Sequence, residues 1–148
     1  MSAGSVIGLD YGAKTVGVAA TDGLGLTAQP LETIFREKES HLRPTMRRIE
    51  AIAKERGAEL IVVGLPVNMD GSEGERAKAA RAFGAELERR LKLPVKFADE
   101  RLTTFEADGI LDEMGVAARD RKKYIDKIAA ALILEEYMKS GGPRGEKL

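Results

Sequence analysis

The chain has 148 residues, of which 43 % are hydrophobic and 32 % charged, as is typical of one globular domain. Its 24 basic and 24 acidic residues cancel, so no global positive field draws it to nucleic acid, and any such contact must come from local clustering. Cysteine is absent, which excludes disulfides, thiolate zinc sites and cysteine nucleophiles, and suits a cytoplasmic location. The single histidine, His41, excludes a histidine-rich metal site.

The N-terminal residues show no signal-peptide pattern, and no apolar run is long enough to cross a membrane, so we expect no membrane partner. Residues 6–9 and 15–21 are rich in β-branched and apolar side chains and flank a glycine-containing segment, which predicts a hairpin. A third strand is expected over 29–35. Residues 41–56 carry apolar side chains at helical spacing, and Gly57 is placed to end that helix.

The second half of the chain alternates strands and helices. A continuous apolar run at 60–63 predicts a strand buried on both faces, and 75–91 predicts an amphipathic helix. A short strand is expected at 95–98, then helices around 107–114 and over 125–138. The order indicates an α/β fold: an antiparallel three-strand meander extended by two parallel strands, with helices on both faces. We expect one domain over 1–139 and a flexible tail over 140–148.

Three acidic residues, Asp10, Glu100 and Asp126, each lie beside an apolar run, where an ionised carboxylate is costly unless it is compensated. If the three converge, a hard divalent cation with oxygen ligands is the simplest compensation. Each acid also has an ordinary interpretation. Asp10 suits a turn, and Asp126 suits the first turn of a helix. Asp99 adjoins Glu100, and neighbouring strand residues face opposite sides, so the residues alone leave open which of the two faces a metal.

Cations and donor-rich loops adjoin these acids. Lys14 lies across the predicted hairpin turn, and Arg101 follows the acid pair. The loop 64–74 follows a buried strand, at the edge where α/β domains bind ligands, although its sequence suits an ordinary turn equally well. The run 119–127 is the strongest local positive patch, and alone it would suit a solvated face. The candidate substrate-binding residues are Lys14, Asn68, Ser72, Arg101, Arg121, Lys122 and Lys123.

Four segments together resemble the YqgF family, also called RuvX, whose members are bacterial RNase H-like proteins described as pre-16S rRNA nucleases or as Holliday junction resolvase-like proteins. The match runs in order over nearly the whole chain. The segments are Gly8-Leu9-Asp10-Tyr11-Gly12-x-Lys14, Val63-Gly64-Leu65-Pro66-x-Asn68-Met69-Asp70-Gly71, Asp99-Glu100-Arg101-Leu102-Thr103-Thr104-x-Glu106-Ala107 and Asp126-x-x-Ala129-Ala130.

The resemblance implies an RNase H-like fold and selects Asp10, Glu100 and Asp126 as catalytic, metal-binding carboxylates. It implies hydrolysis of phosphodiester bonds with two Mg²⁺ or Mn²⁺ ions, Asp10 bridging both and each other acid completing one coordination shell. The expected partner is structured RNA, with 5′-end processing of pre-16S rRNA during ribosome biogenesis as the expected role. Lys127 departs from the family pattern, which has a small polar residue there; pointing away from the metal, it would extend the basic patch.

Three other functions are considered. A resolvase-type endonuclease acting on branched DNA would need a symmetric homodimer with two active sites, and the sequence identifies no dimer interface. A catalytically silent nucleic-acid-binding module could carry the same fold. ATPases related to sugar kinases, actin and Hsp70 share the hairpin, but they use two such domains, and this chain has room for only one.

Overall fold

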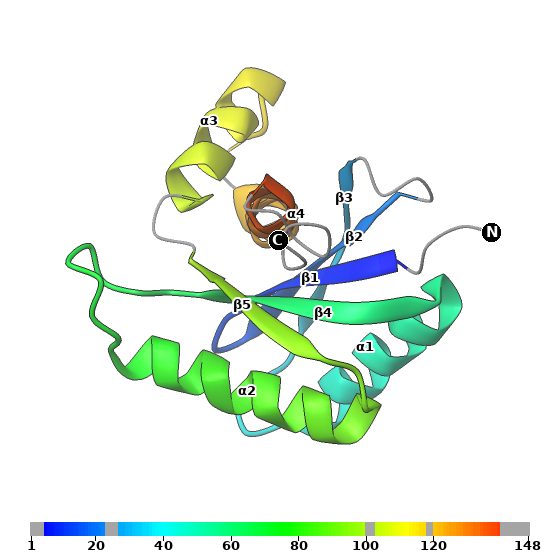
Figure 1. The fold of residues 1–148 in the computed structure, drawn as a ribbon. Coiled ribbons are helices and arrows are strands. Elements are labelled where there is room, and N and C mark those ends of the chain that lie inside the picture. Colours follow the sequence, from blue (N-terminus) through cyan, green and yellow to red (C-terminus); the bar gives the residue numbers. More distant parts are fainter. Residues whose placement is uncertain (1–4, 23–26, 100–102, 118–119, 140–148) are drawn as a thin grey trace.

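The computed structural model describes residues 5–22, 27–99, 103–117 and 120–139, and at 103–108, 122 and 123 it describes the backbone alone. Within these ranges the elements follow the predicted order (Figure 1). In chain order they are β1 (Ser5–Tyr11), β2 (Thr15–Thr21), β3 (Ala28–Phe35), α1 (Leu42–Arg56), β4 (Ala58–Leu65), α2 (Glu75–Leu91), β5 (Val95–Asp99), α3 (Thr103–Met114) and α4 (Arg121–Lys139).

The strands form one mixed sheet in the order β3-β2-β1-β4-β5. Strand β2 is antiparallel to both β1 and β3, whereas β4 is parallel to β1 and to β5. The predicted mixed sheet is therefore confirmed. In this arrangement the carboxyl ends of β1, β4 and β5 and the start of β2 meet at one edge, which we call the carboxyl edge.

Two element boundaries differ from the prediction in ways that matter for the site. Asp10 and Tyr11 lie within β1, not in the turn, because the hairpin ladder continues to the Gly12 N–H, which donates to the Thr15 carbonyl over 2.7 Å. Helix α4 begins at Arg121, earlier than the predicted 125, so part of the basic run is helical. The prediction for Gly57 is confirmed, since it ends α1 with φ 61° in the left-handed conformation.

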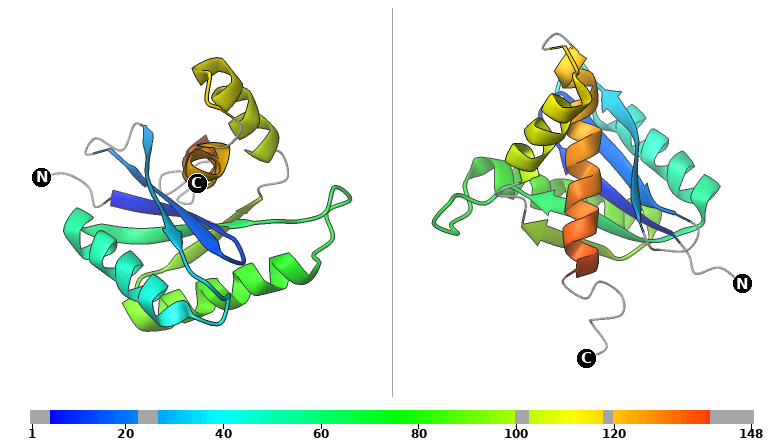
Figure 2. Two further views of the ribbon diagram at one scale, coloured as in Figure 1. Left: turned by 180° about the vertical axis from the view of Figure 1, so that it is seen from behind. Right: turned by 90° about the horizontal axis from the view of Figure 1, so that it is seen from above.

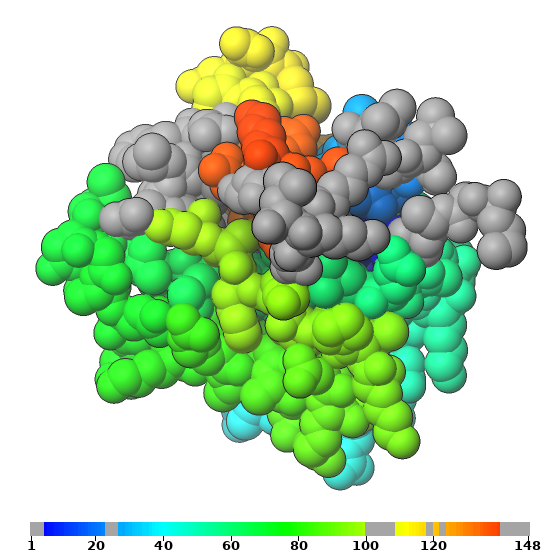
Figure 3. Space-filling model, viewed as in Figure 1, coloured from blue at the N-terminus to red at the C-terminus, as the bar shows by residue number. Residues whose placement is uncertain are grey.

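Helices α1 and α2 cover one face of the sheet, which we call the α1/α2 face (Figure 1). This face buries the larger core, built from aliphatic strand residues and from the apolar stripes of the two helices. In Figure 3 the green atoms of α2 and the yellow-green atoms of β5 cover the lower front of the molecule, and α3 projects at the top. The largest fully buried members of this core are Phe83, Ile7, Leu9, Ile49, Ile61, Leu87, Val16 and Val18.

Helix α4 lies across the opposite face, here called the α4 face, with α3 packed beside it (Figure 2). The helix contacts β1, β2 and β3 most extensively. Small strand residues permit this close approach: a Cβ added to Gly8 would lie 2.9 Å from the Ala130 carbonyl oxygen. Among the described residues, no helix has the length and apolar character needed to cross a membrane.

Candidate active site

Asp10 lies near the end of β1 on the α4 face. Its neighbours in the strand, Leu9 and Tyr11, point into the core under α1 and α2, while Gly8 faces α4. Because alternate residues of a strand share a face, Asp10 projects to the same side as Gly8. Asp10 is half-buried and pairs directly with Gly17 of β2. The strand, rather than a turn, therefore fixes the direction of this carboxylate.

Asp126 of α4 lies directly over Gly17. A Cβ added to Gly17 would fall 1.9 Å from the Asp126 carbonyl oxygen and 2.2 Å from its carbonyl carbon, so only glycine permits this packing. Since Gly17 is also the strand partner of Asp10, the structure brings Asp10 and Asp126 to neighbouring positions on one face, although 116 positions separate them in the sequence (126 − 10).

Thr15 fixes the direction of the Asp126 side chain. Its Oγ1 donates a hydrogen bond of 2.5 Å to Asp126 Oδ2, joining the first residue of β2 to α4. A hydrogen bond to a carboxylate is stronger than one between neutral groups. This bond uses Oδ2 of Asp126 and not Oδ1. Lys127 extends along its own helix, with its ammonium nitrogen 5.0 Å from the ring centroid of Tyr124.

The described residues also exclude one acid from the α4 face. Asp99 ends β5 opposite Leu65, which belongs to the α1/α2 core, and the residue before it, Ala98, belongs to the α4 core. Asp99 therefore faces away from Asp10. Glu100 and Arg101 lie outside the described residues. Within the part of the chain that the structure describes, no three acidic or histidine side chains form a metal-binding group.

The loop after β4 adopts ordinary turn chemistry. The Asn68 side-chain amide donates to Ser72 Oγ over 2.9 Å, and Ser72 Oγ donates to Asp70 Oδ1 over 2.6 Å. The Gly71 N–H also donates to the Asn68 carbonyl. The two predicted substrate-binding side chains are thus near each other and exposed, but in this conformation they bond within their own loop.

The basic candidates are distributed around the same edge. Lys14 is exposed in the β1–β2 turn. Arg121, at the start of α4, forms an ion pair with Asp112 of α3 and so joins the two helices. Lys122 and Lys123 occupy the first turn of α4, but their side chains lie outside the description. Lys14 is the predicted cation that the structure places in the same hairpin as Asp10.

Sequence analysis missed a charged network beneath the hairpin, on the α1/α2 face. Arg36 is 9 % exposed, its Nη2 donates to the Gly12 carbonyl over 2.7 Å, and its guanidinium lies 4.9 Å from the Tyr11 ring centroid. The Tyr11 hydroxyl donates to Glu39 over 2.8 Å, and Arg76 binds both oxygens of that carboxylate. These residues are far apart in sequence and follow no motif, so no local signal could have grouped them.

This network shifts two titrations. The hydrogen bond from Arg76, and after it the one from Tyr11, lowers the pKa of the Glu39 carboxyl. Burial, followed by the hydrogen bond to Glu39, raises the pKa of the Tyr11 hydroxyl. Tyr11 also stacks on Phe83 of α2, with ring centroids 4.2 Å apart. The residue that follows Asp10 is therefore held by several contacts.

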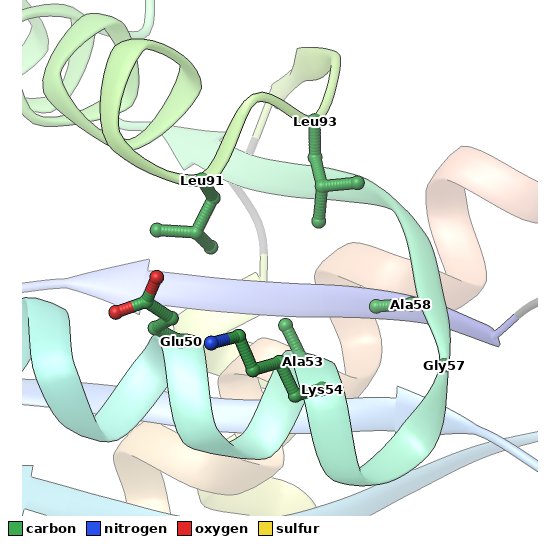
Figure 4. A pocket seen from close by; sticks show the side chains of 7 residues that line it. All are labelled: Glu50, Ala53, Lys54, Gly57, Ala58, Leu91 and Leu93. Carbon is green, nitrogen blue, oxygen red and sulfur yellow. The ribbon is translucent and has the colours of Figure 1, made fainter.

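A hollow of about 200 Å³ lies at the opposite edge of the sheet (Figure 4). Its lining includes Gly57 and Ala58, at the start of β4, and Leu91 and Leu93, which point into it from the end of α2 and the segment after it. Since Ala58 pairs with Ser5 at the start of β1, the hollow is separated from Asp10 by the length of the strand. Its lining is mainly aliphatic, so it is not the candidate active site.

Comparison with solved structures defines the class of the fold. A structure described as "T. thermophilus RuvC in complex with Holliday junction substrate" matches with a TM-score of 0.55 over 95 % of this chain and 98 % of that one, at 16 % sequence identity. A second, "Thermus thermophilus RuvC structure", matches with a TM-score of 0.53 over 93 % and 97 % of the two chains, at 18 % identity. The chain thus has a RuvC-like, RNase H-like fold, as expected.

Sequence comparison then places the chain in one family. Residues 4–140 match the family model "RuvX: Holliday junction resolvase", and the chain belongs to this family. A protein from Lachnospira eligens is 56 % identical over 91 % of this chain and 96 % of its own length. A Lactococcus lactis protein is 47 % identical over 90 % and 92 %. Both are named "Putative pre-16S rRNA nuclease". A nuclease is the activity that this membership supports.

Proposed function

We propose that this protein is a metal-dependent nuclease that hydrolyses phosphodiester bonds at the carboxyl edge of the sheet and processes the 5′ end of pre-16S rRNA in the cytoplasm. The observation that carries the proposal is the close packing of Asp126 on Gly17, the strand partner of Asp10. That packing supports a site in which the Asp10 carboxylate on the sheet and the Asp126 carboxylate on α4 act together. The names of the curated relatives support RNA as the substrate.

The donor set suits a hard divalent cation. Asp10 and Asp126 offer carboxylate oxygens on one face, and no cysteine or second histidine is available to favour a softer metal. Two like charges held close together also need a counter-charge. We infer that Mg²⁺ or Mn²⁺ would bind to Asp10, Glu100 and Asp126.

 Two such ions would polarise the phosphate and supply the attacking hydroxide when bound.

Glu100 is proposed as the third acid because its neighbour is excluded. Asp99 faces the α1/α2 core side of the sheet, and Ala98, two positions before Glu100, belongs to the α4 core. Since Asp99 faces the other side, Glu100, which the family resemblance selects, is the acid of this pair that we assign to the site with Asp10 and Asp126. Thr15 orients Asp126, and Lys14 is the candidate for a phosphate contact in the same hairpin.

The experiment compares Asp10→Asn with the wild type on a structured RNA that contains the 5′ end of pre-16S rRNA, with Mn²⁺ present. The variant keeps the size of the side chain and removes its charge, so we expect cleavage to be lost while the circular dichroism spectrum and melting temperature without metal stay close to those of the wild type. Asp99→Asn is the matched control, because its side chain faces away from the site, and it should cleave normally. Undiminished cleavage by Asp10→Asn would refute the proposal.

A second candidate, a resolvase acting on branched DNA, is favoured by the description of the family model. The same purified protein can be offered a four-way DNA junction and the rRNA precursor under identical conditions. Preferential cleavage of the junction, together with a dimer in sedimentation analysis, would favour the resolvase. If neither substrate is cut but both bind, the protein is a binding module that has the acids without the activity.

A further inference from the structure

Phe35, at the end of β3, is 65 % exposed. The residue before it, Ile34, packs against the core under α1 and α2, and Thr33 is half-buried. A single exposed apolar side chain is common on protein surfaces and means little by itself. Phe35 differs from an incidental exposed side chain in its position beside the candidate site.

Phe35 is the direct strand partner of Thr15. Opposed residues of an antiparallel pair share a face and have Cβ atoms about 4.5–5.5 Å apart. Because Thr15 donates its hydrogen bond to Asp126, the Phe35 side chain emerges on the α4 face next to the residue that orients a proposed metal ligand. The ring thus adjoins the candidate site at its β3 side.

The strand pairing that carries the ring continues one step beyond it. The Arg36 N–H donates to the Lys14 carbonyl over 2.8 Å, which continues the β2–β3 pairing one step beyond Thr15 and Phe35. Lys14 is therefore opposed to Arg36, on the other face of the strand pair from Phe35 and Thr15. An exposed aromatic ring on which a base can stack is the usual element in proteins that bind single-stranded nucleic acid.

The backbone that carries the ring is held firmly. Arg36, the residue after Phe35, is almost fully buried and donates through Nη2 to the Gly12 carbonyl and through Nε to the Glu39 carbonyl. Its guanidinium also lies against the Tyr11 ring. A platform fixed before binding loses little conformational entropy when a ligand arrives, which favours affinity.

We infer that Phe35 forms a subsite for one unpaired nucleotide, with its base stacked on the Phe35 ring. A base inside a duplex is stacked on both sides and has no free face to offer, so the subsite selects a single-stranded segment. The inference rests on the proposed function and deepens it: the strand bound beside the metal site is unpaired at this nucleotide.

The test measures binding of a single-stranded RNA that carries one 2-aminopurine, placed in turn at successive positions, without added metal so that no strand is cut. Stacking on an aromatic ring quenches this base, so the wild type should quench it at one or two adjacent positions. Phe35→Ala should lose that quenching and bind about 5- to 10-fold more weakly, the lower part of the range for stacking on one aromatic side chain. Phe35→Trp should retain both properties.

Controls separate the subsite from general effects. Met114→Ala removes another exposed apolar side chain, and Lys54→Ala removes a cation beside the hollow at the opposite edge; both should bind as the wild type does. RNA annealed to its complement should show no difference between wild type and Phe35→Ala. Equal affinity and quenching in Phe35→Ala and wild type would overturn the inference. Parallel cleavage of the rRNA precursor with Mn²⁺ by the wild type shows whether the nuclease function stands independently.

Discussion

The two faces of the sheet are built on different principles. On the α1/α2 face, large aliphatic side chains such as Ile61 and Leu87 are fully buried. These side chains separate the backbones of the helices from the sheet. On the α4 face, Gly8 and Gly17 let a helix backbone touch the sheet itself. The first face stabilises the fold through buried area, whereas the second positions polar groups accurately through close backbone contact.

The contrast teaches where a change should affect stability and where it should affect the site. The candidate acids and Thr15 lie on the face with close backbone contact, at its carboxyl edge. Glycines there let the backbone of α4 lie directly on the strands that carry Asp10 and Thr15. The α1/α2 face packs against the other side of the strands. Its residues act on the site by stabilising the sheet.

The largest expected effect on stability comes from Leu87→Ala, which would test whether the two faces act independently. Leu87 is fully buried in α2, and truncating such a side chain costs about 2–5 kcal/mol of unfolding free energy. We expect this loss in urea denaturation, with no change in the increment of stability that Mn²⁺ adds. A smaller metal increment in this variant would mean that the two faces are coupled.

The next largest effect is expected from Gly17→Ala, which disrupts the close contact between β2 and α4. The new methyl group would overlap the Asp126 carbonyl, so α4 must move, and overpacking of this kind costs about 1–3 kcal/mol. Stability and metal-induced stabilisation should both fall. Gly109→Ala on α3 is the matched control, since nothing lies within 4 Å of its added Cβ, and it should raise stability by about 0.5–1 kcal/mol.

A smaller effect is expected from Thr15→Val, which keeps the shape of the side chain and removes its hydroxyl. Losing the hydrogen bond to the half-buried Asp126 should cost about 1 kcal/mol of stability. The rise in melting temperature with Mn²⁺ should also decrease, because the carboxylate loses its orientation. Thr15→Ser should restore that metal response, and a full response in Thr15→Val would show that Asp126 needs no such support.

The smallest effect concerns the pH dependence of the Glu39 network on the α1/α2 face. Because the folded protein holds the pKa of Glu39 below its usual value of 4.5, this carboxylate stabilises the fold above about pH 4.5 and loses that contribution as the pH falls. The difference in melting temperature between wild type and Glu39→Gln should therefore shrink from pH 6 to pH 4. A difference that grows on acidification would contradict the assignment.

Local features follow from the amino-acid sequence alone, because they depend on residues close together in the chain. Helical spacing of apolar residues gave the bounds 75–91 for α2, and Gly57 ended α1 where expected. The order of strands and helices indicated the mixed sheet, and the family resemblance selected the three acids. Their roles in metal binding remain predictions, as does the domain boundary at residue 139.

Contacts between residues far apart in the chain follow from the folded arrangement. Thr15 and Asp126 are 111 positions apart, and no local pattern encodes a hydrogen bond between them. The residue pattern did not show which of Asp99 and Glu100 faces a metal. Pairing of Asp99 with Leu65 assigns Asp99 to the α1/α2 face. Likewise, strand pairing brought Phe35 beside Thr15. Local periodicity fixes which elements form, but the packing of α4 on Gly17 fixes which side chains share a site.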